Sequence, residues 1–285
     1  MNKIAVVTGA TSGIGKAVVE LLLKENIHVV GLGRNIEKIE SAMKEFAHLT
    51  DEANLDFVLG DLSDTRQTNL AGQAIVDFVN EKYDGKIDIL MNIAGIVSSG
   101  LHLNEDGNEV TFAINHLAVF LMTYHMIPLL KKSDDPRILV VSSLSHYWAS
   151  INWKNIQSKK FYNILKSYKR SKLYNVFFVK EFSKRYHDIK IYAIDPGLVK
   201  TELGLKRTNR LAHIIWNSKM NKGKNPLYPA GFMVHVATQE KYLTLSGHYI
   251  KKGISIESSK VSYSPEDARK LWEYSEELTN IKFKY

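Results

Sequence analysis

The first fifteen residues join a short apolar strand to a glycine-rich turn. Residues 4–7 form an apolar run that ends in two valines, which is typical of a buried parallel strand. Residues 8–15 follow at once and contain three glycines, and residues 16–25 continue as an amphipathic helix. In such a strand–turn–helix unit, glycine lets the backbone pass close to a pyrophosphate, which binds at the helix N-terminus. The unit predicts a dinucleotide site formed by Gly9, Thr11, Ser12, Gly13, Ile14 and Gly15.

The rest of the chain alternates apolar runs of strand length with longer segments of helical periodicity. Further strands are predicted at 28–32, 55–60, 87–93, 137–141, 190–194 and 247–250. Helices are predicted at 64–82, 108–131, 231–238 and 265–278, with one more running through Tyr168 to about residue 186. We therefore predict a single domain over residues 1–285, an α/β three-layer doubly wound parallel sheet (Rossmann fold) of about seven strands with helices on both faces. Residues 203–229 are polar and weakly periodic, as expected of a substrate lid.

Composition narrows the class of protein. There is no cysteine, which excludes disulfides, zinc fingers and cysteine nucleophiles, and the ten histidines show no metal-ligand spacing, so we expect no metal. No apolar run reaches eighteen residues and the N-terminus enters a strand directly, so we expect no transmembrane segment, no signal peptide and a cytoplasmic protein. The net charge of +8 suits an anionic ligand such as a phosphorylated cofactor, or weak attraction to lipid or nucleic acid, without choosing among them. We predict no nucleic-acid partner.

The end of the second strand bears on the choice between NAD and NADP. An NAD-specific site usually has an acidic residue here, whereas this chain has Gly33 followed by Arg34 and Asn35. A guanidinium can bind the 2′-phosphate that a carboxylate would repel, so NADP(H) is favoured; otherwise Arg34 is only a solvated loop residue. Further cofactor contacts are predicted after the third and fourth strands, at Asp61, Leu62, Asn92, Ala94 and Gly95.

Tyr168 and Lys172 are four residues apart and would lie on one face of a helix. At roughly 4 Å and an effective dielectric near 20, an ammonium stabilises a phenolate by about 4 kcal/mol, which would bring a tyrosine pKa from about 10 to near neutrality. Such a tyrosine can exchange a proton with a carbonyl or an alcohol. The same spacing recurs at two other pairs, Tyr162/Lys166 and Tyr186/Lys190, the second of which straddles a loop.

Two serines, Ser142 and Ser143, end the strand at 137–141. In an open parallel sheet, ligands bind beyond the carboxyl ends of the strands, so both serines emerge at the expected active-site edge. Alternation along the strand does not decide which of them faces the substrate.

Together these motifs resemble the signature of the short-chain dehydrogenase/reductase family. The matching residues are Thr8, Gly9, Gly13, Ile14, Gly15, Asn92, Ala94, Gly95, Asn115, Ser143, Tyr168, Ser171, Lys172, Pro196, Gly197 and Thr201. The long spacing between Ser143 and Tyr168, and the C-terminal sequence around Trp272, are similar to the retinol dehydrogenase branch, so the resemblance covers nearly the whole chain. We expect no membrane-spanning N-terminal segment of the kind common among animal retinol dehydrogenases, a departure that puts a retinoid substrate in question.

The resemblance implies a role for each matched residue. Tyr168 would be the proton donor, and Lys172 would lower its pKa and hold the nicotinamide ribose. Ser143 would hydrogen-bond the substrate oxygen, and Asn115 would place a water that connects Lys172 to solvent. Further cofactor contacts after the sixth strand would be Pro196, Gly197, Val199 and Thr201, the last two at the nicotinamide carboxamide.

Two functions remain open on these grounds. The favoured one is an NADPH-dependent oxidoreductase that reduces an aldehyde or ketone, lipophilic ones included, or oxidises the matching alcohol. The alternative is a non-catalytic NADP(H)-binding sensor on the same fold, although a sensor has no need of all four catalytic residues.

Two surfaces could contact larger partners. Apolar positions on the helix at 108–131 could form core or pair with a second subunit in a homodimer: Leu117, Phe120, Leu121 and Tyr124. Residues 203–225 contain no acidic residue, interleave apolar residues at helical spacing, and carry the basic residues Lys206, Arg207, Arg210, Lys219, Lys222 and Lys224. This basic lid predicts either a simple pocket cover or, in addition, weak contact with an anionic membrane surface.

Overall fold

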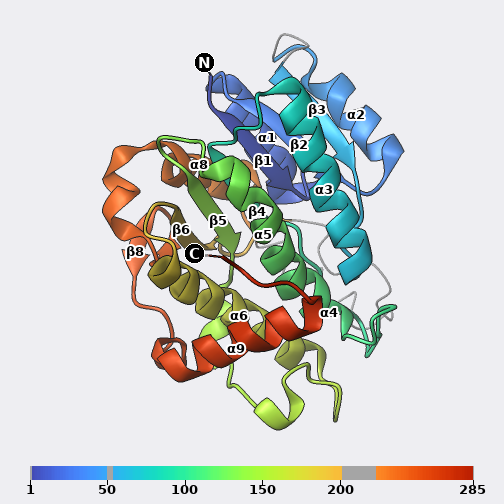
Figure 1. Cartoon of the computed structure of the whole chain (residues 1–285), viewed down its shortest axis with the longest axis vertical. Helices are drawn as coiled ribbons and strands as arrows, with labels where there is room; N and C mark the ends of the chain where they lie inside the picture. The colour runs from blue at the N-terminus through green and yellow to red at the C-terminus, as the bar shows by residue number, and fades with distance from the viewer. Residues whose placement is uncertain (1, 50–53, 201–222, 285) are drawn as a thin grey trace.

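The computed structural model describes residues 2–49, 54–200 and 223–284. Its centre is an eight-stranded sheet in the order β3-β2-β1-β4-β5-β6-β7-β8 (Figure 1). All neighbouring strands are parallel except β8, which pairs antiparallel with β7. The strands are β1 (Ile4–Thr8), β2 (His28–Gly33), β3 (Leu55–Leu59), β4 (Ile89–Asn92), β5 (Arg137–Val141), β6 (Lys190–Asp195), β7 (Tyr249–Lys251) and β8 (Ile254–Ile256).

Helices cover both faces of the sheet, which confirms the predicted doubly wound α/β fold. One face packs against α3 (Thr65–Lys82), α5 (Ala118–Leu130) and α6 (Ile164–Arg185), and α9 (Pro265–Thr279) packs against α6. The other face packs against α1 (Gly13–Lys24), α2 (Ile36–Phe46) and α8 (Leu227–Thr238). Strands buried on both faces appear in the sequence as continuous apolar runs, which is why most of them could be predicted. The strand order reverses between β1 and β4, and a ligand crevice is expected there at the carboxyl ends.

The helix predicted at 108–131 is interrupted near its start. It begins as α4 (Val110–Phe112), widens into a π-helix (Ala113–Leu117) and continues as α5. The predicted catalytic residue Asn115 lies in the π-helical turn. Such turns are rare and occur frequently at functional sites.

Two features of the C-terminal third differ from the prediction. α8 begins at Leu227, so the last residues of the predicted lid are helical. Pro229 is tolerated there because the first turn of a helix leaves its N–H groups unpaired in any case. The sequence does not predict β8, because a three-residue strand after the left-handed residues Lys252 and Gly253 is too short to show a period.

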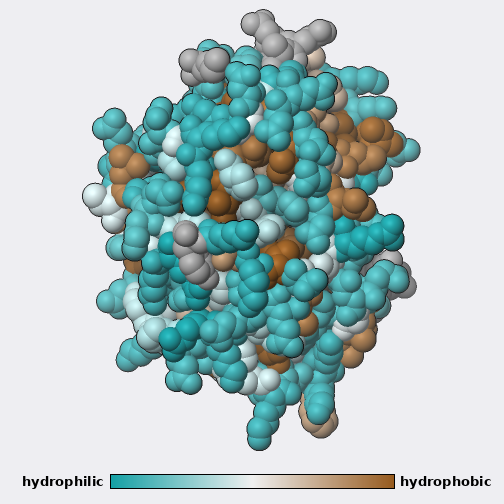
Figure 2. Space-filling model, viewed as in Figure 1, coloured by the Kyte–Doolittle hydropathy of each residue, from teal (hydrophilic) through white to brown (hydrophobic). Residues whose placement is uncertain are grey.

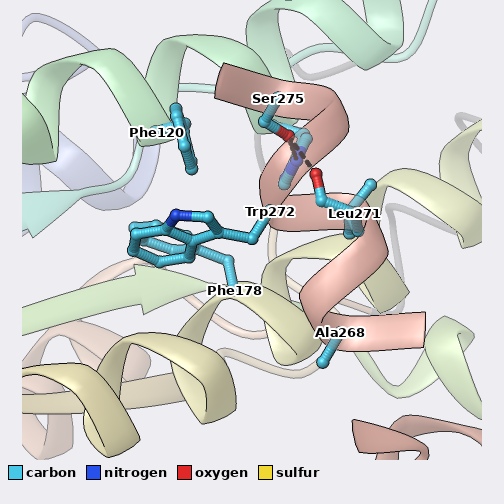
Figure 3. Close-up of a pocket in the computed structure, with 7 residues that line it drawn as sticks. Phe120, Phe178, Ala268, Leu271, Trp272 and Ser275 are labelled. Atoms are coloured by element: carbon cyan, nitrogen blue, oxygen red, sulfur yellow. Dashed lines mark hydrogen bonds between the residues drawn. The ribbon is translucent and has the colours of Figure 1, made fainter. Parts of the chain in front are cut away.

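Apolar residues of α5 pack against α9 of the same chain. The ring centroid of Phe120 lies 5.2 Å from that of Trp272, and Phe178 stacks on Trp272 at 5.6 Å (Figure 3). The ring centroid of Phe120 also lies 4.8 Å from that of Phe283. All four side chains are buried. Of the two predicted roles for Phe120, the core position is confirmed.

Among the described residues, one helical stretch passes the length and composition test for a membrane span. It is Val110–Leu130, with 21 residues and a mean hydropathy of 1.4. Within the fold, 78% of the tested window is buried, as in a core helix. The polar residues Asn115 and His116 interrupt the stretch, which is why the sequence shows no continuous apolar run. The finding is weak evidence for a spanning segment.

Most of the molecule's visible surface in Figure 2 is hydrophilic, with apolar side chains in small separate groups. Several of the exposed apolar side chains follow the carboxyl ends of β5 and β6, at Leu144, Trp148 and Leu198. These ends form the edge of the sheet where a ligand is expected.

Candidate active site

The glycine-rich turn between β1 and α1 is packed too closely for side chains. Gly9 has a φ of +70°, and a Cβ there would lie 3.1 Å from the Cα of Ala94. A Cβ on Gly15 would lie 2.2 Å from the carbonyl oxygen of Gly9. Gly13, the first residue of α1, also has a positive φ, of +55°. The turn thus exposes bare backbone at the N-terminus of a helix, which fits a dinucleotide pyrophosphate.

Thr8 ties this turn to the end of β4. Its hydroxyl oxygen accepts hydrogen bonds from the N–H groups of Ile93 (3.0 Å) and Ala94 (3.1 Å). Thr8 therefore holds the turn against the end of β4. It is not among the predicted cofactor contacts, but a hydroxyl residue between the strand and the glycine-rich turn could have indicated this structural role. Asn92, which is among them, is buried, and its side chain donates to Thr123 on α5 at 3.2 Å. The Asn92 side chain therefore braces β4 and points away from the crevice.

The residues after β2 leave one guanidinium exposed. A Cβ on Gly33 would lie 2.7 Å from the Cγ2 of Thr11, so packing excludes an acidic side chain at this position. Arg34 is exposed, and no hydrogen bond or ion pair holds its guanidinium within residues 2–49, 54–200 and 223–284. Asn35 instead uses its side chain to cap α2, accepting from the N–H of Lys38 at 2.8 Å.

The remaining predicted cofactor contacts follow β3 and β6. The carboxylate of Asp61 accepts from the next backbone N–H at 2.7 Å. Gly197 has a φ of +74° and donates its N–H to the buried Asp195 at 2.9 Å, so it turns the chain sharply after β6. Val199 is 5% exposed. Thr201 lies outside the described residues.

The two serines after β5 face different ways. Ser142 is buried, and its hydroxyl donates to the backbone carbonyl of Lys172 at 2.8 Å. Ser143 is only partly buried, and its side chain acts on the tyrosine, lowering the pKa of the Tyr168 hydroxyl. The β5–α6 packing therefore brings Ser143, and not Ser142, to the tyrosine.

Lys172 and Asn115 meet beside Gly95, just past the end of β4. A Cβ on Gly95 would lie 3.1 Å from the Asn115 Oδ1 and 3.6 Å from the Lys172 Nζ. The Lys172 Nζ lies 5.7 Å from the ring centroid of Tyr168 and donates to a carbonyl at the end of β5 at 3.1 Å. The Asn115 amide accepts from the N–H of Ile96 (2.7 Å) and donates to its carbonyl (2.9 Å). The structure thus brings the four predicted catalytic residues together: Asn115, Ser143, Tyr168 and Lys172.

Burial dominates the proton affinities in this cluster. It raises the pKa of Tyr168 to about 12, while the hydrogen bond with Ser143 acts to lower this pKa and the charge of Asp195 acts to raise it. Burial also lowers the pKa of Lys172 to about 8. The pKa of Tyr168 is therefore not brought near neutrality as the sequence predicts, because desolvation of the phenolate by burial is the largest cause of its shift and raises it. These protein groups keep Tyr168 protonated at neutral pH.

The two competing tyrosine–lysine pairs do not share a helix face. Tyr162 precedes α6, and its hydroxyl donates to the buried carboxylate of Glu109 at 3.2 Å, while Lys166 is exposed. Tyr186 follows the last residue of α6 and donates to a backbone carbonyl near the C-terminus at 2.7 Å. Tyr168 alone of the three lies on α6 beside its lysine.

Most of the predicted lid, residues 203–229, lies outside the described residues, and so do five of its six basic side chains. The choice between a pocket cover and a membrane-contacting segment therefore stays a prediction. The homodimer also stays a prediction.

Comparison with known proteins identifies relatives over the whole chain. Residues 3–211 match a family model described as short chain dehydrogenase. Mouse (Mus musculus) retinol dehydrogenase 11 is 31% identical, over 98% of this chain and 87% of that protein. Human (Homo sapiens) retinol dehydrogenase 12 is 32% identical over 99% and 88%, and human polyprenol dehydrogenase is 26% identical over 98% and 86%.

Solved structures show the same fold at lower identity. An uncharacterised protein from Mycobacterium paratuberculosis superposes with a TM-score of 0.78 at 23% identity, covering 99% of this chain and 95% of that one. An alcohol dehydrogenase from the archaeon Thermococcus sibiricus, complexed with 5-hydroxy-NADP, has a TM-score of 0.64 at 18% identity, covering 90% and 97%.

Proposed function

The chain belongs to the short-chain dehydrogenase/reductase family, in its retinol dehydrogenase branch, and on that premise we propose that it is an NADPH-dependent reductase of lipophilic aldehydes or ketones. Family membership makes it an oxidoreductase that binds a nicotinamide cofactor and transfers hydride between CH–OH and C=O groups. The proposal adds the cofactor type, the substrate class and the residues that act. The cluster of Ser143, Tyr168 and Lys172 at the carboxyl ends of the strands carries it.

We assign each polar group of the cluster a step in carbonyl reduction. The Tyr168 hydroxyl gives its proton to the substrate oxygen, which suits a group whose pKa of about 12 keeps it protonated. Ser143 donates a hydrogen bond to the same oxygen as negative charge develops there. Lys172 contributes a positive charge that favours the tyrosinate left behind. The nicotinamide, when bound, supplies the hydride that the carbonyl carbon gains.

The residues present fit a dinucleotide of the NADP type. The bare backbone of the glycine-rich turn suits the pyrophosphate, and Gly33 leaves no acidic side chain to repel a 2′-phosphate. The exposed guanidinium of Arg34 follows directly and can bind that phosphate.

Replacing Arg34 with alanine should weaken NADPH use selectively. A charge-assisted hydrogen bond contributes about 1.5–3 kcal/mol, so kcat/KM for NADPH should fall by roughly 10- to 150-fold, while that for NADH changes little. Steady-state kinetics with both cofactors measure this. As a control, Lys44→Ala removes an exposed positive charge from α2. It should leave kcat/KM for NADPH and for NADH close to the wild-type values. Equal losses with NADPH and NADH in Arg34→Ala would refute the NADP assignment.

Two observations support a lipophilic substrate. The side chains of Leu144, Trp148 and Leu198 follow β5 and β6 at the active-site edge, and are 38%, 66% and 48% exposed. The names of the relatives, retinol dehydrogenase and polyprenol dehydrogenase, also refer to lipophilic alcohols. NADPH consumption should be faster with long-chain or isoprenoid aldehydes than with short polar ones. NADPH binding without turnover on any carbonyl in a broad panel would favour the sensor alternative instead.

We also propose that the protein is cytoplasmic, which cell fractionation would test.

A further inference from the structure

A surface pocket lies near the C-terminal end of α6, away from Tyr168, which lies near the N-terminal end of this helix. It is a cleft of about 230 Å³ between the C-terminal half of α6, the turn before β7 and the N-terminus of α9. Lys180, which lines it, follows Tyr168 by twelve residues, or about 18 Å along a helix. His248, which also lines it, precedes the amino end of β7, whereas the candidate active site is at the carboxyl ends of the strands. The pocket is therefore separate from the candidate active site.

Two lysines one helical turn apart give the pocket its charge. Lys180 is half-buried, its Nζ lies 3.8 Å from the ring centroid of Tyr263, and no carboxylate forms an ion pair with it in the described part of the chain. Lys184 is 3.9 Å from Glu181, but that carboxylate is already held by Arg185 at 2.8 and 2.7 Å. Burial and the charge of Lys184 both lower the pKa of Lys180. Like charges at this spacing destabilise a helix, and a bound anion would relieve that repulsion.

Further hydrogen-bond donors come from the other two walls. The hydroxyl oxygen of Ser246 accepts from the N–H of Ile191 at 3.1 Å, which leaves its own proton available. The hydroxyl oxygen of Ser264 accepts from the N–H of Asp267 at 3.2 Å and likewise keeps its proton. The fifteen-residue helix α9 begins here, and Glu266 and Asp267 in its first turn offset the partial positive charge of its N-terminus. None of the residues that line the pocket is acidic.

We propose that this pocket binds a small soluble phosphate-bearing anion, either inorganic phosphate or a phosphate monoester. Lys180 and Lys184 supply two charges from one wall, and Ser246 and Ser264 supply hydroxyl donors from the other two. A phosphate has three or more acceptor oxygens that can meet donors from three directions at once, which a planar carboxylate cannot. The volume is below the roughly 300–1,000 Å³ of pockets for drug-sized ligands, which fits a small anion. A bound phosphate links α6, β7 and α9.

Calorimetric titration of inorganic phosphate into NADPH-saturated protein at low salt tests the proposal, because the cofactor site is then filled. Wild type should bind one phosphate per chain. The Lys180→Met/Lys184→Met variant keeps the apolar stems but loses two charge-assisted hydrogen bonds, so its affinity should fall by at least about 10-fold. Lys184→Met alone should give an intermediate loss. The matched double variant Lys44→Met/Lys159→Met, at exposed positions elsewhere, should keep wild-type affinity.

The proposal fails if wild type shows no saturable phosphate binding, or if both double variants bind phosphate equally. Unchanged circular dichroism and NADPH affinity would show that the lysine variants are folded. A second arm replaces phosphate with vesicles of phosphatidic acid in phosphatidylcholine. Lysine-dependent binding of these vesicles without binding of free phosphate would overturn the assignment to a soluble anion.

Discussion

Replacing Tyr168 with phenylalanine should lower NADPH-dependent turnover by a factor on the order of 10²–10⁴ while NADPH still binds. The substitution keeps the ring in its place on α6 but removes the hydroxyl whose pKa Ser143 lowers and that would give up the proton. The glycine-rich turn and Arg34, which would hold the cofactor, are untouched. Single-turnover kinetics and cofactor fluorescence would separate the chemical step from binding.

Tyr162→Phe is the matched control. This variant also loses a phenolic hydroxyl from a tyrosine that lies four residues before a lysine. The hydroxyl of Tyr162, however, donates to Glu109 at 3.2 Å. Turnover should stay within a few-fold of wild type, because this change weakens a hydrogen bond remote from the chemistry. An inactive Tyr162→Phe beside an active Tyr168→Phe would place the active site elsewhere.

The fold could be predicted where burial leaves a clear pattern in the sequence. The strand β5 lies between helices on both faces, so its residues are all apolar after Arg137, and its predicted bounds match the structure. Arg137 itself is fully buried, because its guanidinium is bound by Asp135 and by carbonyls at the end of α8. β8 and the π-helix at Asn115 leave no such pattern, since one is too short and the other departs from helical geometry by a single turn.

The sequence predicts which residues form the candidate site, but it does not predict the proton affinities of those residues. Gly9, Gly15 and Gly33 are fixed by close backbone approaches that leave glycine as the residue that fits, so the sequence carries that information directly. The proton affinity of Tyr168 depends on how much water the surrounding side chains exclude, and no spacing rule contains that quantity. The choice between Ser142 and Ser143 depends on where the α6 backbone lies, which is a tertiary property.

A buried histidine next to Asn115 should make stability fall with acid. His116 lies beneath α9, where its Nε2 is 2.9 Å from the hydroxyl of Ser275, and it lines the same small pocket as Phe120 and Trp272. Burial lowers the pKa of His116 to about 4, partly offset by Asn175. The unfolded chain, with a histidine pKa of about 6.5, binds the proton more readily. The contribution of neutral His116 to the free energy of unfolding is therefore fully present above about pH 6.5. As the pH falls, this free energy decreases by about 2 kcal/mol at pH 5 and about 3 kcal/mol near pH 4.

The free energy of unfolding by urea, measured between pH 7 and pH 4.5, would show this loss when wild type is compared with His116→Gln. Glutamine can still donate to Ser275 but does not titrate, so the variant should be less stable at pH 7 and lose less stability on acidification. Burial also lowers the pKa values of His125 and His146, but both residues are present in the two proteins and their contributions cancel in the difference. If the two proteins lost stability in parallel over this range, the pKa of His116 would be the same in the folded and unfolded states. Its burial beneath α9 would then have to be incomplete.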